Sequence, residues 1–452
     1  MLNIIKSSIF ERKLTIFSPQ NFISMDNSLN SSNRLYSEMV DTLSDSEIRQ
    51  IAGAVNALIK KGERVFNLTI GDFNPKVFPV PEKFVEEVHK AYLEGHTNYP
   101  PVNGEPALQE TISEYLKLRG DLDYKPDDIL ISCGGRPLIY AVYQTFVNPG
   151  ETILYPVPSW NNNYYVHLCR ANEITIETKP EDNFMPSAAS IEPHLSKAAI
   201  IALCSPLNPT GTVLTKESVA EICNIILDEN KRREAKGVKP LYVMFDQIYW
   251  LLTHGDTKHY SPVLVNPDIR KYMVVCDGMS KAFAGTGIRV GWAFSEKSTI
   301  DKMKAVLSHI GAFPPKPEQV AAARFLSNHA EVDKFLNNFK SQIKQRLDGF
   351  YAVFMKLKSQ GFKVNAIAPQ AAIYLTVEID IIGKTKPDGT KINDTKDATK
   401  YILDEAKIGL VPFTAFGSFE NPTWYRLSVG TCELSDVEEA GNNLFNALSK
   451  LK

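Results

Sequence analysis

The stretch from Gly278 to Gly291 holds two basic residues in a setting that suits cofactor chemistry. Lys281 follows a short apolar run, 272–276, that predicts a buried strand, and Arg289 comes eight residues later. An amine at the end of a strand can form a Schiff base with a carbonyl compound. A guanidinium nearby can hold a phosphate through two parallel hydrogen bonds. An ordinary surface lysine is the alternative, so the interpretation depends on the other motifs of the chain.

A glycine pair lies between a predicted strand and a predicted helix. The segment Ser132-Cys133-Gly134-Gly135-Arg136 follows an apolar run, and a helix is predicted to begin near Pro137. Two glycines before a helix expose backbone N–H groups, and the helix dipole adds positive potential, so this segment predicts an anion site. A plain strand-to-helix turn is the alternative. Trp160, after the next predicted strand, could equally be a core residue.

Two more polar motifs follow apolar runs. Asn208 begins Asn-Pro-Thr-Gly after the run 200–203, and this motif needs no function if it is only a turn. Asp246 and Tyr249 follow the run 242–245. A carboxylate directly after a buried strand is costly unless it is paired, so Asp246 requires a partner.

Gly71, Arg426 and Tyr99 are three further candidate residues. Gly71, in Gly71-Asp-Phe-Asn-Pro, satisfies turn chemistry, and Arg426, in Trp-Tyr-Arg-Leu-Ser, could form a surface salt bridge. Tyr99 lies five residues before Gly104.

In their order along the chain, from about Ser44 to Lys450, the motifs resemble those of class I/II aminotransferases, pyridoxal-phosphate enzymes of fold type I. The resemblance is strongest to the aspartate aminotransferase subgroup with Gly-Gly-Lys and Asn-Gly-x-Ser-Lys motifs, which read Gly-Gly-Arg and Asp-Gly-x-Ser-Lys here. It implies ping-pong transfer of an amino group from an L-amino acid to a 2-oxo acid, with aspartate and 2-oxoglutarate as the best guess. Aromatic or methionine donors, or a carbon–sulfur lyase or cyclising synthase on the same fold, are alternatives.

The resemblance also implies roles for individual residues and no metal. Lys281 would carry the cofactor and act as general base and acid, Asp246 would pair with the pyridine nitrogen, and Tyr249 would donate to the cofactor's 3′ oxygen. The implied cofactor site further comprises Gly134, Gly135, Arg136, Trp160, Asn208, Ser280, Arg289 and, from a neighbouring subunit of a homodimer, Tyr99. The implied substrate site comprises Gly71, Arg136, Trp160, Asn208 and Arg426. Cys204 departs from the usual asparagine at its position.

Short β-rich runs alternate with helical segments and predict an α/β fold with a mainly parallel sheet covered on both faces. In fold type I this is a seven-stranded sheet in a large domain, with a smaller α+β domain beside it. We expect a disordered leader at 1–30, the N-terminal part of the small domain at 31–75, the large domain at 76–325 and the rest of the small domain at 326–452. A capping box, Ser44-x-x-Glu47, is predicted to open the first helix and Gly62 to close it.

Charge, cysteine content and missing motifs argue against several classes of protein. A net charge of -2 over 452 residues gives no reason to expect nucleic acid or a membrane surface as partner. Six scattered cysteines indicate reduced thiols and a cytoplasmic location. About 45 residues precede the first predicted helix, too few for the DNA-binding domain of a transcription regulator. No G-x-G-x-x-G motif follows the first strand, which argues against a nucleotide-binding dehydrogenase.

The first 25 residues differ from the rest, since Lys6, Arg12 and Lys13 are accompanied by a single acidic residue, Glu11. We expect a disordered or dispensable leader here. A transit peptide, or a true start at Met25, are the alternatives.

Overall fold

The computed structural model describes residues 35–452, of which 35–43 belong to one compact unit and 44–452 to another. In the first unit the described part contains one short helix, α1 (Glu38–Asp41). The expected leader, 1–30, lies outside the described residues. The helices and strands from α2 onward belong to residues 44–452. Within the described residues no helix is both long and apolar enough to cross a membrane.

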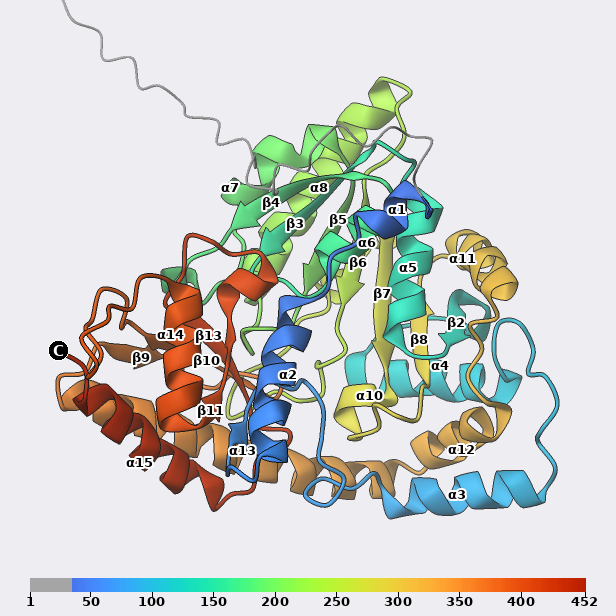
Figure 1. Cartoon of the computed structure of the whole chain (residues 1–452). Helices are drawn as coiled ribbons and strands as arrows, with labels where there is room; N and C mark the ends of the chain where they lie inside the picture. Colours follow the sequence, from blue (N-terminus) through green and yellow to red (C-terminus); the bar gives the residue numbers. More distant parts are fainter. Residues whose placement is uncertain (1–34) are drawn as a thin grey trace, which may run out of the picture. The chain divides into compact units, whose positions relative to one another are not determined.

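A seven-stranded sheet with the strand order β2-β8-β7-β6-β5-β3-β4 organises most of the second unit (Figure 1). Its strands are β2 (Ile129–Ser132), β3 (Thr152–Val157), β4 (Asn172–Glu177), β5 (Ala198–Cys204), β6 (Tyr242–Asp246), β7 (Met273–Gly278) and β8 (Gly291–Phe294). Every neighbouring pair is parallel except the two that involve β8. The predicted mainly parallel α/β sheet is therefore confirmed. The sequence reading missed β8, whose four residues include a glycine and make a weak strand signal.

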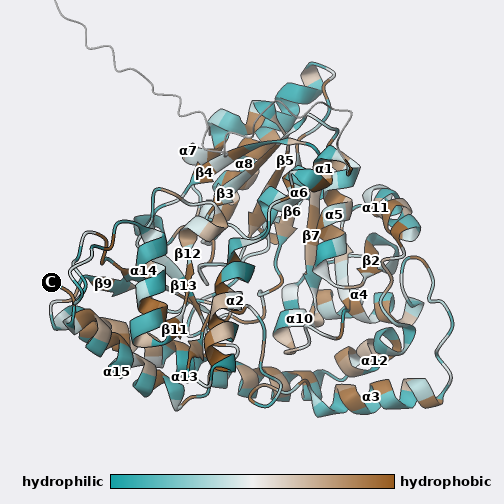
Figure 2. Ribbon diagram, in the orientation of Figure 1, coloured by the Kyte–Doolittle hydropathy of each residue, from teal (hydrophilic) through white to brown (hydrophobic). Residues whose placement is uncertain are grey.

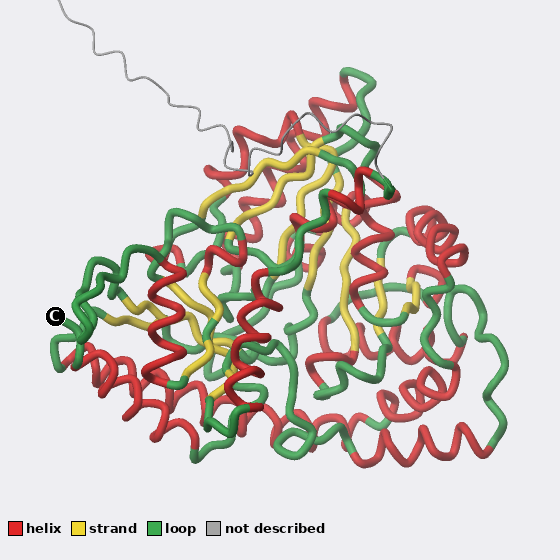
Figure 3. The backbone as a smooth tube through the Cα atoms, viewed as in Figure 1, coloured by secondary structure: helices red, strands yellow, loops and turns green. Residues whose placement is uncertain are grey.

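Helices cover both faces of this sheet, as Figure 3 shows. Alternate strand residues reach opposite faces, so Val243 and Phe245 join one apolar cluster and Met244 joins the other. One cluster contains side chains of α4 (Pro106–Gly120), α8 (Lys216–Ala235) and α12 (Lys316–Ser327), and the other those of α5 (Gly135–Phe146), α6 (Asn162–Leu168) and α11 (Lys297–Ile310). Burial on both faces explains why the strands read as continuous apolar runs, brown in Figure 2.

The remaining helices of this part are short or peripheral. They are α3 (Glu82–Leu93), which packs on α12, with α7 (Ala188–Ile191), α9 (Pro262–Val265) and α10 (Met279–Ala282). The last of these directly follows β7, and it carries Lys281.

The C-terminal part contains an antiparallel sheet with the order β12-β13-β10-β9. Its strands are β9 (Val364–Ala366), β10 (Tyr374–Ile379), β12 (Val411–Pro412) and β13 (Trp424–Ser428), and its helices are α13 (His329–Ser359), α14 (Thr395–Tyr401) and α15 (Asp436–Ser449). Apolar side chains of α13, β10 and α15, among them Phe350, Leu375 and Leu444, share one core.

The segment before the large sheet packs with this C-terminal part. Strand β1 (Phe66–Asn67) pairs in parallel with β11 (Ile408–Gly409), and α2 (Glu47–Lys60) lies against β11 (Figure 1). The predicted small domain, 31–75 with 326–452, requires contacts of this kind between the N-terminal segment and the C-terminal part.

The predicted capping box of the first helix is wrong in detail. The N-cap of α2 is Ser46, not Ser44, and its side chain makes no capping hydrogen bond. The spacing S-x-x-E recurs in polar segments, so the pattern alone does not fix the first residue of a helix. The stop at Gly62 is confirmed, since this glycine has a φ of +85° just after α2.

Gly211 joins the two parts at close range. Its φ is +71°, and a Cβ there would lie 2.4 Å from the carbonyl oxygen of Tyr374 and 2.9 Å from that of Ala371. The backbone N–H of Ala371 also donates to the Gly211 carbonyl at 2.8 Å. A glycine at this place therefore lets the loop after β5 lie directly against the start of β10.

We expect Gly211→Ala to lower the free energy of unfolding by about 2–4 kcal/mol, because the new methyl group meets backbone that cannot rotate away. Gly237→Ala is the matched control, since its φ is +64° but no atom lies within 4 Å of the added carbon. It should cost only about 1 kcal/mol. Urea unfolding of both variants measures the difference, and equal losses would contradict the close approach.

Candidate active site

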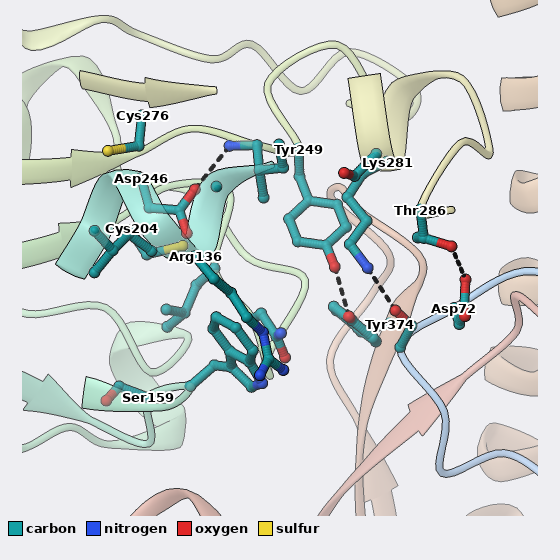
Figure 4. A pocket seen from close by; sticks show the side chains of 18 of the residues that line it. Asp72, Arg136, Ser159, Cys204, Asp246, Tyr249, Cys276, Lys281, Thr286 and Tyr374 are labelled. Atoms are coloured by element: carbon teal, nitrogen blue, oxygen red, sulfur yellow. Dashed lines mark hydrogen bonds between the residues drawn. The ribbon is translucent and has the colours of Figure 1, made fainter. Parts of the chain in front are cut away.

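A cavity of about 510 Å³ opens beyond the carboxyl ends of β5, β6 and β7 (Figure 4). Ligands of parallel α/β sheets bind at this edge. The sheet supplies one side of the lining, β10 and β13 supply another, and α2 adds Ile48, Arg49 and Ala52. Of the residues predicted from sequence, those that line the cavity are Gly71, Gly135, Arg136, Trp160, Asn208, Asp246, Tyr249, Ser280, Lys281, Arg289 and Arg426.

Lys281 points into the cavity from α10, directly after β7 (Figure 4). Its Nζ donates a hydrogen bond to the carbonyl oxygen of Gly71 at 2.5 Å. Burial lowers the pKa of Lys281 to about 8, although the carboxylate of Asp72 acts in the opposite direction. A lysine with this pKa has a sizeable neutral fraction near neutral pH, and a neutral amine is a nucleophile and a base.

Asp246 ends β6 and faces the same cavity. Its Oδ1 accepts a hydrogen bond from the backbone N–H of Ile248 at 3.0 Å. Burial raises the pKa of Asp246 to about 6, while that hydrogen bond and the charge of Lys281 act against the rise. A buried carboxylate with so few partners is suited to a cationic group of a ligand.

Arg289 and the glycine pair form a cationic corner of the cavity. The Arg289 guanidinium donates to the carbonyl oxygens of Thr286 at 2.7 Å and Cys133 at 2.9 Å. Gly134 has a φ of +89°, and a Cβ there would lie 2.2 Å from Nη2 of Arg289. Two of the five guanidinium N–H groups are thus used for positioning, and the rest can bind an anion together with the free N–H groups of the first turn of α5.

Arg426 reaches the cavity from β13 and is 2% exposed. Its Nη1 donates to Oδ1 of Asn208 at 2.9 Å and its Nη2 to the carbonyl oxygen of Thr69 at 2.5 Å. Its Nε–H has no partner among the described residues, and burial lowers the pKa of this guanidinium. An unpartnered buried donor costs about 1–3 kcal/mol, which a bound carboxylate would offset.

Arg136 lies over the ring of Trp160, with its guanidinium carbon 4.8 Å from the centroid of a ring. This contact holds the arginine at the cavity without neutralising its charge. Figure 4 shows it on the side opposite Lys281.

Tyr99 is the predicted site residue that the chain does not bring to this cavity. Its side chain is 89% exposed, and it is absent from the lining. Gly134 also does not line the cavity, but it packs directly against Arg289.

The structure adds three residues that sequence reasoning missed as site residues. Tyr374 hydrogen-bonds Tyr249, their hydroxyl oxygens being 2.6 Å apart. Asp72 accepts a hydrogen bond from Thr286 Oγ1 at 2.5 Å, and both line the cavity (Figure 4). Asp72 directly follows Gly71 and could have been noticed there. Tyr374 lies in an apolar strand, where a tyrosine reads as core.

The donor set fits pyridoxal phosphate on three observations of the geometry. The positive-φ glycine beside Arg289 and the start of α5 provide N–H donors for a phosphate. The buried carboxylate of Asp246 suits a protonated ring nitrogen, and the pKa of Lys281, lowered by burial, suits attachment to a carbonyl carbon.

Comparison with known proteins places this geometry in a family. A sequence profile of aminotransferase class I and II matches residues 63–444. An aspartate aminotransferase of Bacillus sp. (strain YM-2) is 27% identical over 412 residues, which cover 90% of this chain and 97% of the relative. A probable aspartate/prephenate aminotransferase of Rickettsia conorii is 29% identical over 376 residues, covering 82% and 88%.

Solved structures agree. Aspartate aminotransferase from Thermus thermophilus with maleate superposes with a TM-score of 0.79 at 25% identity, covering 92% of this chain and all of that one. The enzyme from Rhizobium meliloti superposes with a TM-score of 0.82 at 22% identity, covering 93% and 100%. Because the profile spans most of the sequence, the transaminase prediction is confirmed over the dehydrogenase alternative: the chain belongs to the class I and II aminotransferases.

Proposed function

We propose that the cavity is the active site and that Lys281, Asp246, Arg289 and Arg426 are its working residues. The observation that carries this proposal is that a partly buried amine, a partly buried carboxylate and two guanidinium groups from separate segments open onto one cavity. The cofactor of this aminotransferase is pyridoxal phosphate. The residues proposed to hold it are Gly134, Gly135, Ser280 and Arg289 at the phosphate, Trp160 at the ring, Asn208 and Tyr249 at the 3′ oxygen, and Asp246 at the ring nitrogen.

The chain's own groups divide the work of transamination. When bound, the cofactor withdraws electrons from the substrate's α-carbon. Arg426 binds the substrate α-carboxylate. Gly71 has no side chain at this place, and a Cβ on it would lie 2.5 Å from the Tyr374 hydroxyl, so its backbone can lie close to the bound carboxylate. Nζ of Lys281 removes the proton from the α-carbon, as general base, and later returns a proton as general acid. Asp246 holds the proton of the ring nitrogen.

For the substrate we propose aspartate with 2-oxoglutarate. Arg136 presents a charge at the cavity that Trp160 positions and does not neutralise, so a second carboxylate of the substrate supplies the missing anion. The printed names of the relatives, aspartate aminotransferases, and the dicarboxylate maleate in the Thermus thermophilus structure support this assignment. A carbon–sulfur lyase on the same fold would instead release pyruvate without any oxo-acid acceptor.

We also propose a cytoplasmic homodimer. All six cysteines are free, which fits a reducing compartment. Tyr99 carries a large aromatic ring that is exposed and lies outside the cavity of its own chain. In a dimer this hydroxyl reaches the partner's cofactor phosphate.

Cofactor attachment tests the role of Lys281. The rate at which added pyridoxal phosphate joins the cofactor-free enzyme should rise with pH around a midpoint near 8, because the pKa of Lys281 is lowered to about 8 and only the neutral amine reacts. Stopped-flow absorbance measures this rate. Lys281→Ala should fold normally yet show no attachment and no turnover. A midpoint near that of an exposed lysine, about 10.4, would contradict the buried setting.

Arg136→Ala tests the substrate. We expect a loss in kcat/KM for aspartate that corresponds to roughly 2–4 kcal/mol of transition-state stabilisation. The kcat/KM for tyrosine and the cofactor affinity should be nearly unchanged. Arg49→Ala is the matched control, because Arg49 lines the cavity from α2 and is exposed. Equal losses for aspartate and tyrosine would assign Arg136 to the phosphate, and a larger aspartate-specific loss in the control would assign the second carboxylate to Arg49.

Mixed dimers test the shared site. Sedimentation at low micromolar concentration should give twice the chain mass of 50.5 kDa. Co-expressed Lys281→Ala and Tyr99→Ala chains should recover one intact site per mixed dimer, because both changes fall in the other site. A fully active monomer, or no recovery on mixing, would contradict this arrangement.

A further inference from the structure

Tyr374 lines the cavity and has no role in the proposed transamination. It begins β10 and is 1% exposed. Its hydroxyl oxygen lies 2.6 Å from that of Tyr249, and the two rings are 5.5 Å apart at 69° (Figure 4). Neither hydroxyl makes another hydrogen bond to residues 35–452 in the structure. The pair therefore forms a closed, buried unit at the edge of the cavity.

Two hydroxyl groups that share one hydrogen bond have one hydrogen left over. If Tyr249 donates to Tyr374, its own hydrogen is spent and cannot reach a ligand. If Tyr374 donates to Tyr249, the hydrogen of Tyr249 is free to point into the cavity. The direction of this single bond thus decides whether Tyr249 can donate to the 3′ oxygen of the cofactor.

The surrounding charges favour Tyr374 as the donor. The Arg426 guanidinium lies over the Tyr374 ring at 4.8 Å, and a cation there makes the phenol a stronger donor. Burial raises the pKa of both hydroxyls, well above the ordinary value for Tyr249, and the negative charge of Asp246 adds to that rise. The charged or titratable groups that act on the pair are Arg426, Asp72, Cys204, Asp246 and Lys281.

Two close contacts fix Tyr374 in this position. A Cβ added to Gly71 would lie 2.5 Å from the Tyr374 hydroxyl oxygen, and a Cβ added to Gly211 would lie 2.4 Å from the Tyr374 carbonyl oxygen. Both glycines leave room for β10 to approach, so Tyr374 lies in close contact with the segments that contain Gly71 and Gly211.

We propose that Tyr374 is a positioning residue that donates to Tyr249 and thereby commits the hydrogen of Tyr249 to the 3′ oxygen of the cofactor. This inference rests on the proposed role of Tyr249. It also connects the substrate clamp with the cofactor, since Arg426 lies against the same ring.

Tyr374→Phe in the holoenzyme removes only the hydroxyl. A hydrogen donated by Tyr249 stabilises negative charge on the 3′ oxygen and lowers the proton affinity of the nitrogen that joins the cofactor to Lys281. Loosening that donor should raise the pH midpoint of the cofactor's visible absorbance by about 0.5–1 unit. Spectrophotometric pH titration measures the midpoint, and the cofactor dissociation constant is measured alongside it.

Three comparisons make the test decisive. Tyr249→Phe should shift the midpoint at least as far, and adding Tyr374→Phe to it should produce no further shift. Tyr425→Phe, which removes a buried hydroxyl from the neighbouring strand outside the cavity, should leave the midpoint unchanged. A shifted Tyr249→Phe with an unshifted Tyr374→Phe, or additive shifts, would overturn the inference alone. An unshifted Tyr249→Phe would overturn the proposed role of Tyr249 itself.

Discussion

Burial of ionisable groups in one cavity is the constraint on which this structure depends. Asp246, Lys281 and Arg426 lie together there, and burial shifts the pKa of each toward its neutral form. Each has fewer protein partners than a buried charge requires. The free energy that the fold gives up at this edge is recovered when a ligand with complementary charges binds, so stability and catalysis are linked at the same groups.

Close backbone approach is what assembles these groups. The sheet presents Asp246 and Lys281 at its carboxyl edge, whereas Arg426 comes from an antiparallel strand of the C-terminal part. Glycines at 71, 134 and 211 remove the side chains that would hold these segments apart. A methyl group at any of them would displace a guanidinium, a hydroxyl or a carbonyl oxygen from the cavity wall. The polar residues of the site therefore depend on positions that carry no side chain.

Local patterns predicted much of this arrangement, and their failures have physical reasons. Buried strands read as apolar runs because both faces of the sheet are covered, and the motifs after them line the cavity as expected. The short antiparallel strand β8 escaped notice, since pairing with β2 and β7 stabilises a four-residue segment that has little local signal. Ser44 matches a capping pattern but does not cap, because the first helix begins after Ser46 instead.

By itself, the sequence determined the fold class and most of the cavity-lining residues, because apolar runs, glycine turns and their order are local features that survive without knowledge of contacts. Tertiary structure alone decided which side chains meet. Tyr374 and Tyr249 are 125 residues apart, and although Tyr249 was predicted as a site residue, Tyr374 reads as an ordinary aromatic residue of a buried strand. Their contact depends on the register of β10 and on the space left by two glycines, and a hydrogen bond only 2.6 Å long follows from that packing and from no pattern in the chain.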